Sequence, residues 1–321
     1  MISEEQVTEQ LDSTIDKVDF AGAISRHSGK VRESFELSQG RRAIVVTDRV
    51  SAFDFVLGTV PFKGQVLNQI SAWWFDELDK INIPHHFLSV PHSNISVVKN
   101  AKVLPIEIIV RGYLTGSTKT SSWYAYQNLD RNICGIIMPE GMVKNEKFDS
   151  PIITPTTKPD TGHDEAISKE EILEQGLVTH SMYKQVEAYA LKMFAHGQKV
   201  AAERGLILVD TKYEMGIDEA GDLMVIDEVH TPDSSRYWIE DSYAARLSCG
   251  QEPESLDKEF VRSMMVKAGY DVDSDEDPQK YMTDKVRIEA AKKYMILYEK
   301  MTGKVFEVQK TSLIEEILER L

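Results

Sequence analysis

The sequence predicts an α+β protein of two lobes, and three observations lead to this class. The chain has 321 residues, more than one small domain usually contains. Short β-branched and apolar runs bounded by Gly and Pro, typical of strands, fill the region up to about residue 110. Apolar residues spaced by three and four, typical of helices, follow from about residue 180. We therefore expect an acidic N-terminal segment (1–20), a strand-rich N-terminal lobe (21–110) and a mixed C-terminal lobe (111–321) with a helical end.

Hydrophobic periodicity places the elements within these lobes. Val66, Ile70 and Leu78, for example, share one face of a helix. The segments expected to be helices are 64–81, 179–204, 255–269, 278–303 and 311–321, and those expected to be strands are 30–37, 41–48, 53–64 and 103–117. Residues 130–165 are rich in Pro, Gly, Thr and Asp, and we expect them to form a long polar loop.

The composition excludes several classes of protein. The chain has 37 Lys and Arg residues against 52 Asp and Glu residues, a net charge of −15, which opposes non-specific binding to nucleic acid or an anionic membrane. Its cysteines, Cys134 and Cys249, form neither a CxxC pair nor a zinc-binding pattern, so no disulfide framework is expected. The N-terminus is acidic and polar, unlike a signal peptide, and no apolar run approaches a membrane span. We expect a globular cytoplasmic protein without nucleic-acid or membrane partners.

Two short apolar runs, Leu206–Val209 and Leu223–Ile226, each end in acidic residues. Strand alternation places Asp210, Lys212 and Glu214 on one face, together with the leucines of the first run. A turn at residues 219–222 would make the two runs a hairpin in which Glu214 lies opposite Asp227. A slip of one residue would move Asp227 to the other face, so this pairing depends on the register.

Facing carboxylates repel each other unless a cation lies between them. Mg²⁺ is typically held by one or two carboxylates, with phosphate oxygens and water completing its shell. Lys212, between the acids, could hold a phosphate or an acyl oxygen as a compact charge. The hairpin therefore indicates either metal–phosphate chemistry or a solvated strand end with structural salt bridges.

Other polar segments allow two interpretations each. "RGYLTGSTK" lacks the P-loop spacing, but Arg111 and Ser117 at a strand end suit a phosphate or carboxylate, as well as an ordinary polar loop. Arg236 in "TPDSSRYW" could form a fork on a phosphate or neutralise nearby acids. His163 in "KPDTGHDE" is a candidate base or a solvated surface histidine. Nucleophilic catalysis has no support from local sequence.

Two stretches, "VLPIEIIVRGYLTGS" (103–117) and "LVDTKYEMG" (208–216), resemble the signature segments of the SAICAR synthetase family. The resemblance extends through "SGKVRESFEL", "GHDEAIS", "IDEVHTPDSSRYW" and "DKEFVR", and covers most of residues 25–265 in the family's order. The chain's length and the form of "TPDSSRYW" look like the longer, fungal-type branch. The resemblance implies a two-lobed α+β fold related to ATP-grasp and kinase-like architectures, with ATP between the lobes.

The resemblance also implies a reaction. An ATP-dependent ligase would join L-aspartate to the carboxylate of 5-amino-1-(5-phospho-D-ribosyl)imidazole-4-carboxylate (CAIR), giving SAICAR, ADP and phosphate in purine biosynthesis. ATP would convert the unreactive carboxylate to an acyl phosphate, with Mg²⁺ and cations around the moving charge. A kinase-like phosphotransferase and a non-catalytic nucleotide-binding protein are the alternatives. The oligomeric state is open, although the longer family members look compatible with a monomer.

The roles that the resemblance implies fall into five groups. They are Mg²⁺ ligands (Glu214, Asp227), groups at the reacting carboxylate and the base of the ribonucleotide (Lys212, Asp210), ATP-binding residues (Lys30, Arg32, Glu107, Lys158), CAIR-binding residues (Arg111, Ser117, Arg236, Lys258, Arg262) and residues for the incoming aspartate (His163, Asp164).

Overall fold

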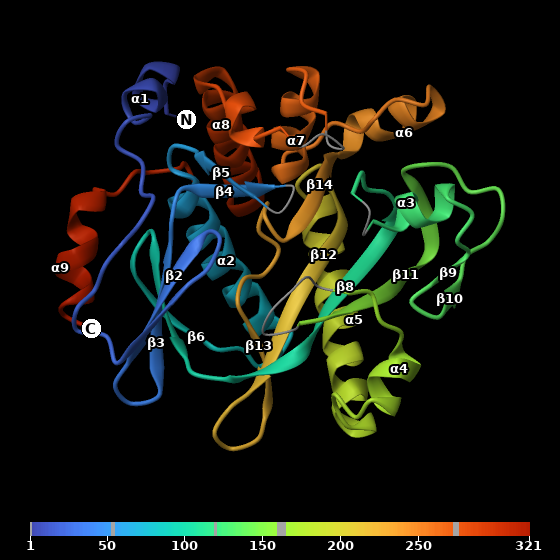
Figure 1. Cartoon of the computed structure of the whole chain (residues 1–321), viewed down its shortest axis with the longest axis horizontal. Helices are drawn as coiled ribbons and strands as arrows, with labels where there is room; N and C mark the ends of the chain where they lie inside the picture. The colour runs from blue at the N-terminus through green and yellow to red at the C-terminus, as the bar shows by residue number, and fades with distance from the viewer. Residues whose placement is uncertain (1, 53–54, 119–120, 159–164, 272–275) are drawn as a thin grey trace.

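The computed structural model describes residues 2–52, 55–118, 121–158, 165–271 and 276–321. Two larger antiparallel sheets dominate it (Figure 1). The first sheet has the order β1-β2-β3-β7-β6 and consists of β1 (Ser25–Ser28), β2 (Arg32–Leu37), β3 (Arg41–Val46), β6 (Phe87–His92) and β7 (Ile95–Lys99). The second has the order β11-β8-β12-β13, with β14 also paired to β12, and consists of β8 (Lys102–Leu114), β11 (Glu146–Thr157), β12 (Leu206–Ile217), β13 (Leu223–Ile226) and β14 (Ser235–Ile239). Two small ribbons pair β4 (Arg49–Ala52) with β5 (Phe55–Thr59) and β9 (Asn132–Ile133) with β10 (Ile136–Ile137).

The helices confirm most of the expected segments. They are α1 (Glu4–Glu9), α2 (Lys63–Lys80), α3 (Ser122–Gln127), α4 (Lys169–Glu174), α5 (His180–Ala202), α6 (Glu240–Ser248), α7 (Lys258–Lys267), α8 (Asp284–Thr302) and α9 (Ile314–Leu318), with 3₁₀ turns η1 (Pro278–Tyr281) and η2 (Thr311–Leu313). The segment expected to be one helix over 278–303 is divided, because Thr283 caps α8 with its hydroxyl and separates it from η1. No helix in the described ranges is long and apolar enough to cross a membrane.

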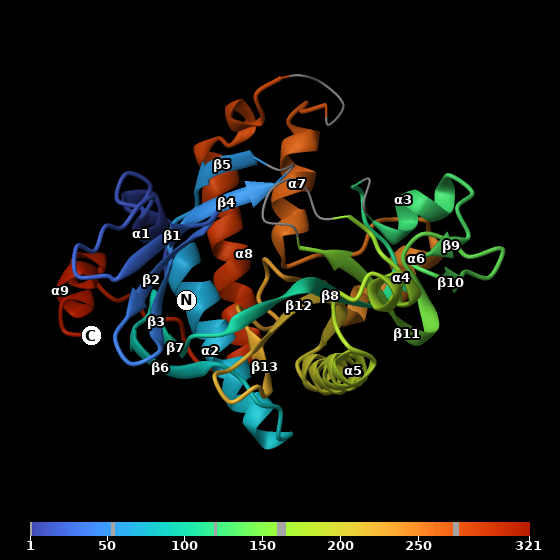
Figure 2. The same cartoon turned by 60° about the horizontal axis from the view of Figure 1, so that its bottom comes forward.

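The helices cover the sheets in three places. Helix α5 packs on one face of the second sheet, where Met193 and Phe194 join a core with Tyr213. Helices α2 and α8 lie side by side between the two sheets (Figures 1 and 2). Helix α9 packs on the first sheet, because Ile314 and Leu318 share a buried cluster with strands β2 and β3. The chain therefore returns to its N-terminal lobe at its C-terminal end, and β8 of the second sheet begins before residue 110.

The predicted long loop at 130–165 is wrong over residues 146–157, which form strand β11. Pro151 and Pro155 masked this strand, because proline cannot donate to a sheet ladder. β11 tolerates them because it is the edge strand of its sheet, paired only with β8 among the described strands, and because its pairing is irregular between Lys147 and Ile152.

A β-bulge corrects the predicted faces of β12. Leu208 pairs with Tyr237 of β14, whereas Asp210 pairs with Arg236, so Val209 is an extra residue between the two pairs. Tyr237 and Arg236 are consecutive and point to opposite faces. Leu208 therefore faces the α5 core and Asp210 faces away from it, rather than sharing one face as simple alternation predicts.

The register of the β12–β13 hairpin also differs from the prediction. Glu214 pairs with Ile226, not with Asp227, because the loop spans Asp218–Asp222 instead of starting at Glu219. The carboxylate of Asp218 accepts hydrogen bonds of 2.9 Å from the amides of Ala220 and Asp222, which holds Asp218 in the loop. Asp227 lies just beyond the strand, with a left-handed φ of 67°.

Candidate active site

The face of the second sheet opposite α5 carries charged side chains from strands β8, β12 and β14, the last of which contributes Arg236. On β12, Asp210, Lys212 and Glu214 alternate onto this face after the bulge. Glu107 of β8 pairs with Glu214 across the ladder, and Arg111 of β8 pairs with Asp210. The flanking strands therefore fix two charged groups, an acidic one around Glu214 and a basic one around Asp210.

The acidic group consists of Glu107 and Glu214 with two lysines. Lys212 Nζ donates to Glu107 Oε1 at 2.7 Å and also to Glu214, while Lys158 pairs with Glu214 and lies 3.4 Å from Glu107. Burial disfavours the charged form of Lys212, but Glu214 and Glu107 outweigh burial and raise its pKa. Burial likewise opposes ionisation of Glu214, but Lys212 and Lys158 lower its pKa. Burial, with repulsion from Glu214, raises the pKa of Glu107 against the effect of Lys212.

Asp227 connects this group to the N-terminal lobe. Arg32 of β2 forms ion pairs with both Asp227 and Glu228, and His86 Nε2 lies 3.3 Å from the Asp227 carbonyl. Burial raises the pKa of Asp227 to about 6 despite Arg32, and the charge of Glu214 adds to the rise. The two carboxylates thus influence each other although they are not cross-strand partners.

These residues fit a metal ion that phosphate oxygens help to hold. Within the described ranges, no three Asp, Glu, His or Cys side chains form a metal-binding group. Mg²⁺ does not require an all-protein cage, because one or two carboxylates suffice when a nucleotide supplies the other oxygens. The Glu214 carboxylate is buried and that of Asp227 is 23% exposed, and flexible Lys or Arg side chains form ion pairs with both. Such partners can exchange for a metal–phosphate group.

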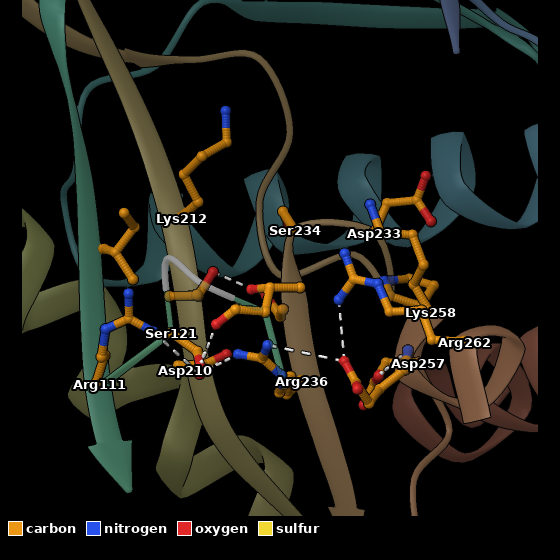
Figure 3. Close-up of a pocket in the computed structure, with 16 residues that line it drawn as sticks. Arg111, Ser121, Asp210, Lys212, Asp233, Ser234, Arg236, Asp257, Lys258 and Arg262 are labelled. Carbon is orange, nitrogen blue, oxygen red and sulfur yellow. Dashed lines mark hydrogen bonds and ion pairs between the residues drawn. The ribbon is translucent and has the colours of Figure 1, made fainter. Parts of the chain in front are cut away.

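The basic group lines a cavity of about 220 Å³ beside Lys212 (Figure 3). Arg236 Nη1 donates to Asp210 Oδ2 at 2.6 Å, and Arg111 Nη1 lies 3.8 Å from the same oxygen. Burial disfavours the charge of Arg236, but Asp210 and Glu259 raise its pKa above the ordinary value. Lys258 and Arg262 of α7 line the opposite side of the cavity. Five cations and four carboxylates line this cavity, so the basic groups outnumber the acids and the space suits an anionic ligand.

The structure brings most of the predicted site residues together in these two groups. Ser117 lies at the edge, where its hydroxyl donates to Glu259 Oε1 at 2.7 Å. Lys30 is exposed in the turn between β1 and β2, next to Arg32 in sequence. His163 and Asp164 lie outside the described residues.

Sequence reasoning missed three contributors to the site. Lys63, fully buried at the start of α2, donates to Asp233 Oδ2 at 2.7 Å in the loop that lines the cavity. Glu259 of α7 accepts from Arg262 at 3.0 Å as well as from Ser117. Asp257 caps α7 by accepting a hydrogen bond of 2.7 Å from the Glu259 amide. A "DK" pair at the start of an amphipathic helix is a recognisable capping signal for Asp257, but the tertiary partners of Lys63 and Glu259 have no local signal.

One face of the second sheet of this two-lobed fold carries both the acidic group around Glu214 and the cation-lined cavity. This arrangement defines an α+β enzyme that acts on anionic small molecules. A family model described as SAICAR synthetase matches residues 25–278. The chain belongs to the SAICAR synthetase family, as the signature segments predict.

Individual relatives agree with this assignment. The phosphoribosylaminoimidazole-succinocarboxamide synthase of Legionella pneumophila (strain Paris) is 46% identical over 281 residues, 88% of each chain. The chloroplastic synthase of Vigna aconitifolia is 50% identical over 241 residues, 75% of this chain and 70% of the relative. The solved SAICAR-synthase from Saccharomyces cerevisiae complexed with SAICAR is 31% identical with a TM-score of 0.75, covering 92% of this chain and all of that chain (100%). These matches confirm the predicted fold class, and the bacterial and plant relatives show that the match extends beyond fungi.

Proposed function

We propose that this chain is the ATP-dependent ligase that joins L-aspartate to CAIR, giving SAICAR, ADP and phosphate. Family membership and the named relatives support the reaction. One structural observation carries the assignment of the site: Lys212 lines the basic cavity and also binds the Glu107–Glu214 group. Lys212 therefore lies where the site for an anionic substrate meets the site for a metal nucleotide. Activation of a carboxylate by ATP requires the two ligands to be this close together.

The nucleotide would lie on the acidic side, between the lobes. We assign Mg²⁺ to Glu214 and Asp227, where the ion would balance charge on the transferring phosphoryl group. Arg32 contacts Asp227 and Lys158 contacts Glu214. Both cations would therefore be within reach of ATP phosphates bound next to these carboxylates. Lys30, in the adjoining turn, is assigned to the same phosphates, and Glu107 to the adenine side.

The ribonucleotide would lie in the basic cavity. Arg236 offers a planar fork for its 5′-phosphate, and Arg111, Ser117, Lys258 and Arg262 add positive charge and a hydroxyl. Asp210 would contact the imidazole base, since it lies between Arg236 and Lys212 on the sheet face. Lys212 would hold the reacting carboxylate against the γ-phosphate, and this positioning is the main catalytic contribution of the chain's own residues. His163 and Asp164 remain our proposal for the incoming aspartate.

The test is to supply Mg-ATP and CAIR to the purified protein with and without L-aspartate, and to follow ADP and the ultraviolet absorbance of the product. We expect ADP and SAICAR together, and only when aspartate is present. ADP without SAICAR would indicate a phosphotransferase instead. Nucleotide binding without ADP formation would contradict catalysis altogether.

Three further expectations remain proposals: a cytoplasmic location, a monomeric state, and lobes divided near residue 110. The acidic composition with two cysteines supports the first.

A further inference from the structure

Glu259 is a carboxylate placed among the cations of the basic cavity. Its Oε1 accepts from Ser117 Oγ at 2.7 Å and its Oε2 from Arg262 Nη1 at 3.0 Å, with Arg236 Nη2 at 3.8 Å. Burial opposes its charge, but Arg236 and Arg262 lower the pKa of Glu259 to about 2. Glu259 is therefore an ionised anion in a place built for an anion.

The other acids of the cavity are fixed in different ways. Asp233 is buried against Lys63, and Asp257 accepts hydrogen bonds from the amides of Tyr237 and Glu259. Among the described residues, the side-chain partners of the Glu259 carboxylate are Arg236 and Arg262 of the cavity wall and Ser117 at its edge, all of which could serve a ligand. Its side chain is also 22% exposed, more than those of Asp233 and Asp210, which are 4% and 6% exposed. Glu259 is thus the acid that can leave the cations at the least cost in buried contacts.

A second cavity gives this side chain a place to move into. This cavity of about 300 Å³ also borders Glu259, because Arg236, Glu259 and Arg262 line both spaces. Rotation of a helix-surface glutamate about its side-chain torsions costs little, because several staggered rotamers are open to it. Displacement of Glu259 would expose the forks of both arginines and the Ser117 hydroxyl.

We propose that Glu259 is an internal counter-ion that occupies the seat of the substrate's phosphate group and is displaced when a phosphorylated substrate binds. This inference rests on the proposed function of the basic cavity. Carboxylate and phosphate use the same guanidinium and hydroxyl donors, so they compete for the seat. A phosphomonoester near its full charge of −2 has three acceptor oxygens and wins this competition, whereas a carboxylate of charge −1 does not. Glu259 thereby selects for the phosphate ester and keeps free carboxylates, including the co-substrate aspartate, out of the seat.

The experiment compares ribose 5-phosphate binding to the full-length wild-type protein and to Glu259→Gln by calorimetry without ATP. Gln is isosteric and still accepts from Ser117, but it has no charge to compete with. We expect the Kd of ribose 5-phosphate to fall about tenfold, the effect of removing one charged competitor. Ribose, which has no phosphate, should bind no better to the variant. The matched control is Glu254→Gln, a surface carboxylate paired with Arg246, which should leave the Kd unchanged.

The outcomes separate this inference from the assignment of the cavity. If the wild-type protein turns over CAIR but ribose 5-phosphate binds Glu259→Gln no more tightly than wild type, the counter-ion role alone is overturned. If the wild-type protein turns over CAIR but ribose 5-phosphate does not compete with CAIR, both the counter-ion role and the assignment of the cavity are overturned. If Glu259→Gln does not fold, Glu259→Asp decides: its shorter reach keeps the charge but loses Ser117, so ribose 5-phosphate should bind more tightly than to wild type.

Discussion

Arg236 of β14 donates a hydrogen bond of 2.6 Å to Asp210, its cross-strand partner on β12. Arg111, from β8 on the other side of β12, lies 3.8 Å from the same carboxylate oxygen. One acid therefore orients two guanidinium groups toward one cavity (Figure 3). Ladder pairing fixes all three positions, so the cavity is organised before any ligand arrives.

Replacing Arg236 by Lys tests the assignment of the phosphate. Lys keeps the charge but cannot form a planar fork, so one charged hydrogen bond is lost. We expect the KM for CAIR to rise about 10- to 100-fold, corresponding to about 1.5–3 kcal/mol. Steady-state kinetics against CAIR measures this, with Arg246→Lys as the control because Arg246 pairs with Glu254 away from the cavity. An unchanged KM for CAIR would rule out the fork.

Replacing Glu214 by Gln tests the metal assignment. The loss of one metal-binding carboxylate should reduce kcat about 100-fold or more and abolish the stimulation of ATP binding by Mg²⁺. Far-ultraviolet circular dichroism should remain that of the wild type. The matched control, Glu219→Gln in the exposed hairpin loop, removes the same charge a few residues away. Normal Mg²⁺-dependent turnover in Glu214→Gln would sink the assignment.

The buried pair between Lys63 and Asp233 predicts a large effect on stability. Lys63→Met would leave the Asp233 carboxylate buried without its cation, which typically costs about 3–5 kcal/mol of unfolding free energy. Lys63→Met combined with Asp233→Asn should recover part of that loss. Urea denaturation measures both effects. Lys80→Met, on the same helix but 64% exposed, should change the free energy by about 0.5 kcal/mol or less. Similar losses for the two lysines would show that the buried pair contributes nothing particular.

Glu259 predicts the direction of a pH effect on stability. Because its folded pKa of about 2 lies below the ordinary value of 4.5, the folded protein favours the ionised form. The resulting stabilisation is present above about pH 4.5 and is lost as the pH falls toward about 2. The free energy of unfolding should therefore drop less steeply on acidification in Glu259→Gln than in the wild type. Parallel curves for the two proteins would contradict this pairing, and Glu254→Gln serves as the control.

The sequence predicted the charged residues of the site better than their geometry. Asp210, Lys212 and Glu214 were identified by strand alternation alone, and they do share one face. Alternation alone predicts the wrong face for Leu208, because a bulge at Val209 has no signature in a run of apolar residues. A bulge depends on the partner strand, so only β14 makes it visible.

Partners that come from distant parts of the chain were beyond sequence reasoning. Asp227 was predicted to face Glu214 on a hairpin, but its ion pair is with Arg32 of the other lobe. Strand β11 was hidden by its prolines, which only an edge position permits. The sequence does not single out Glu259, because a glutamate in a first helical turn is ordinary and its importance comes from its contacts with Ser117 and Arg236.

The packing of α9 on the first sheet has a consequence for how the protein is made. Ile314 and Leu318 complete the buried cluster around Phe35 and Leu37, and Arg41 donates to the Leu321 carbonyl. During translation, strands β2 and β3 leave the ribosome long before the helix that covers them. The part of their apolar face that α9 covers must therefore wait until residues 314–318 have been synthesised, and it is the surface on which a chaperone would act.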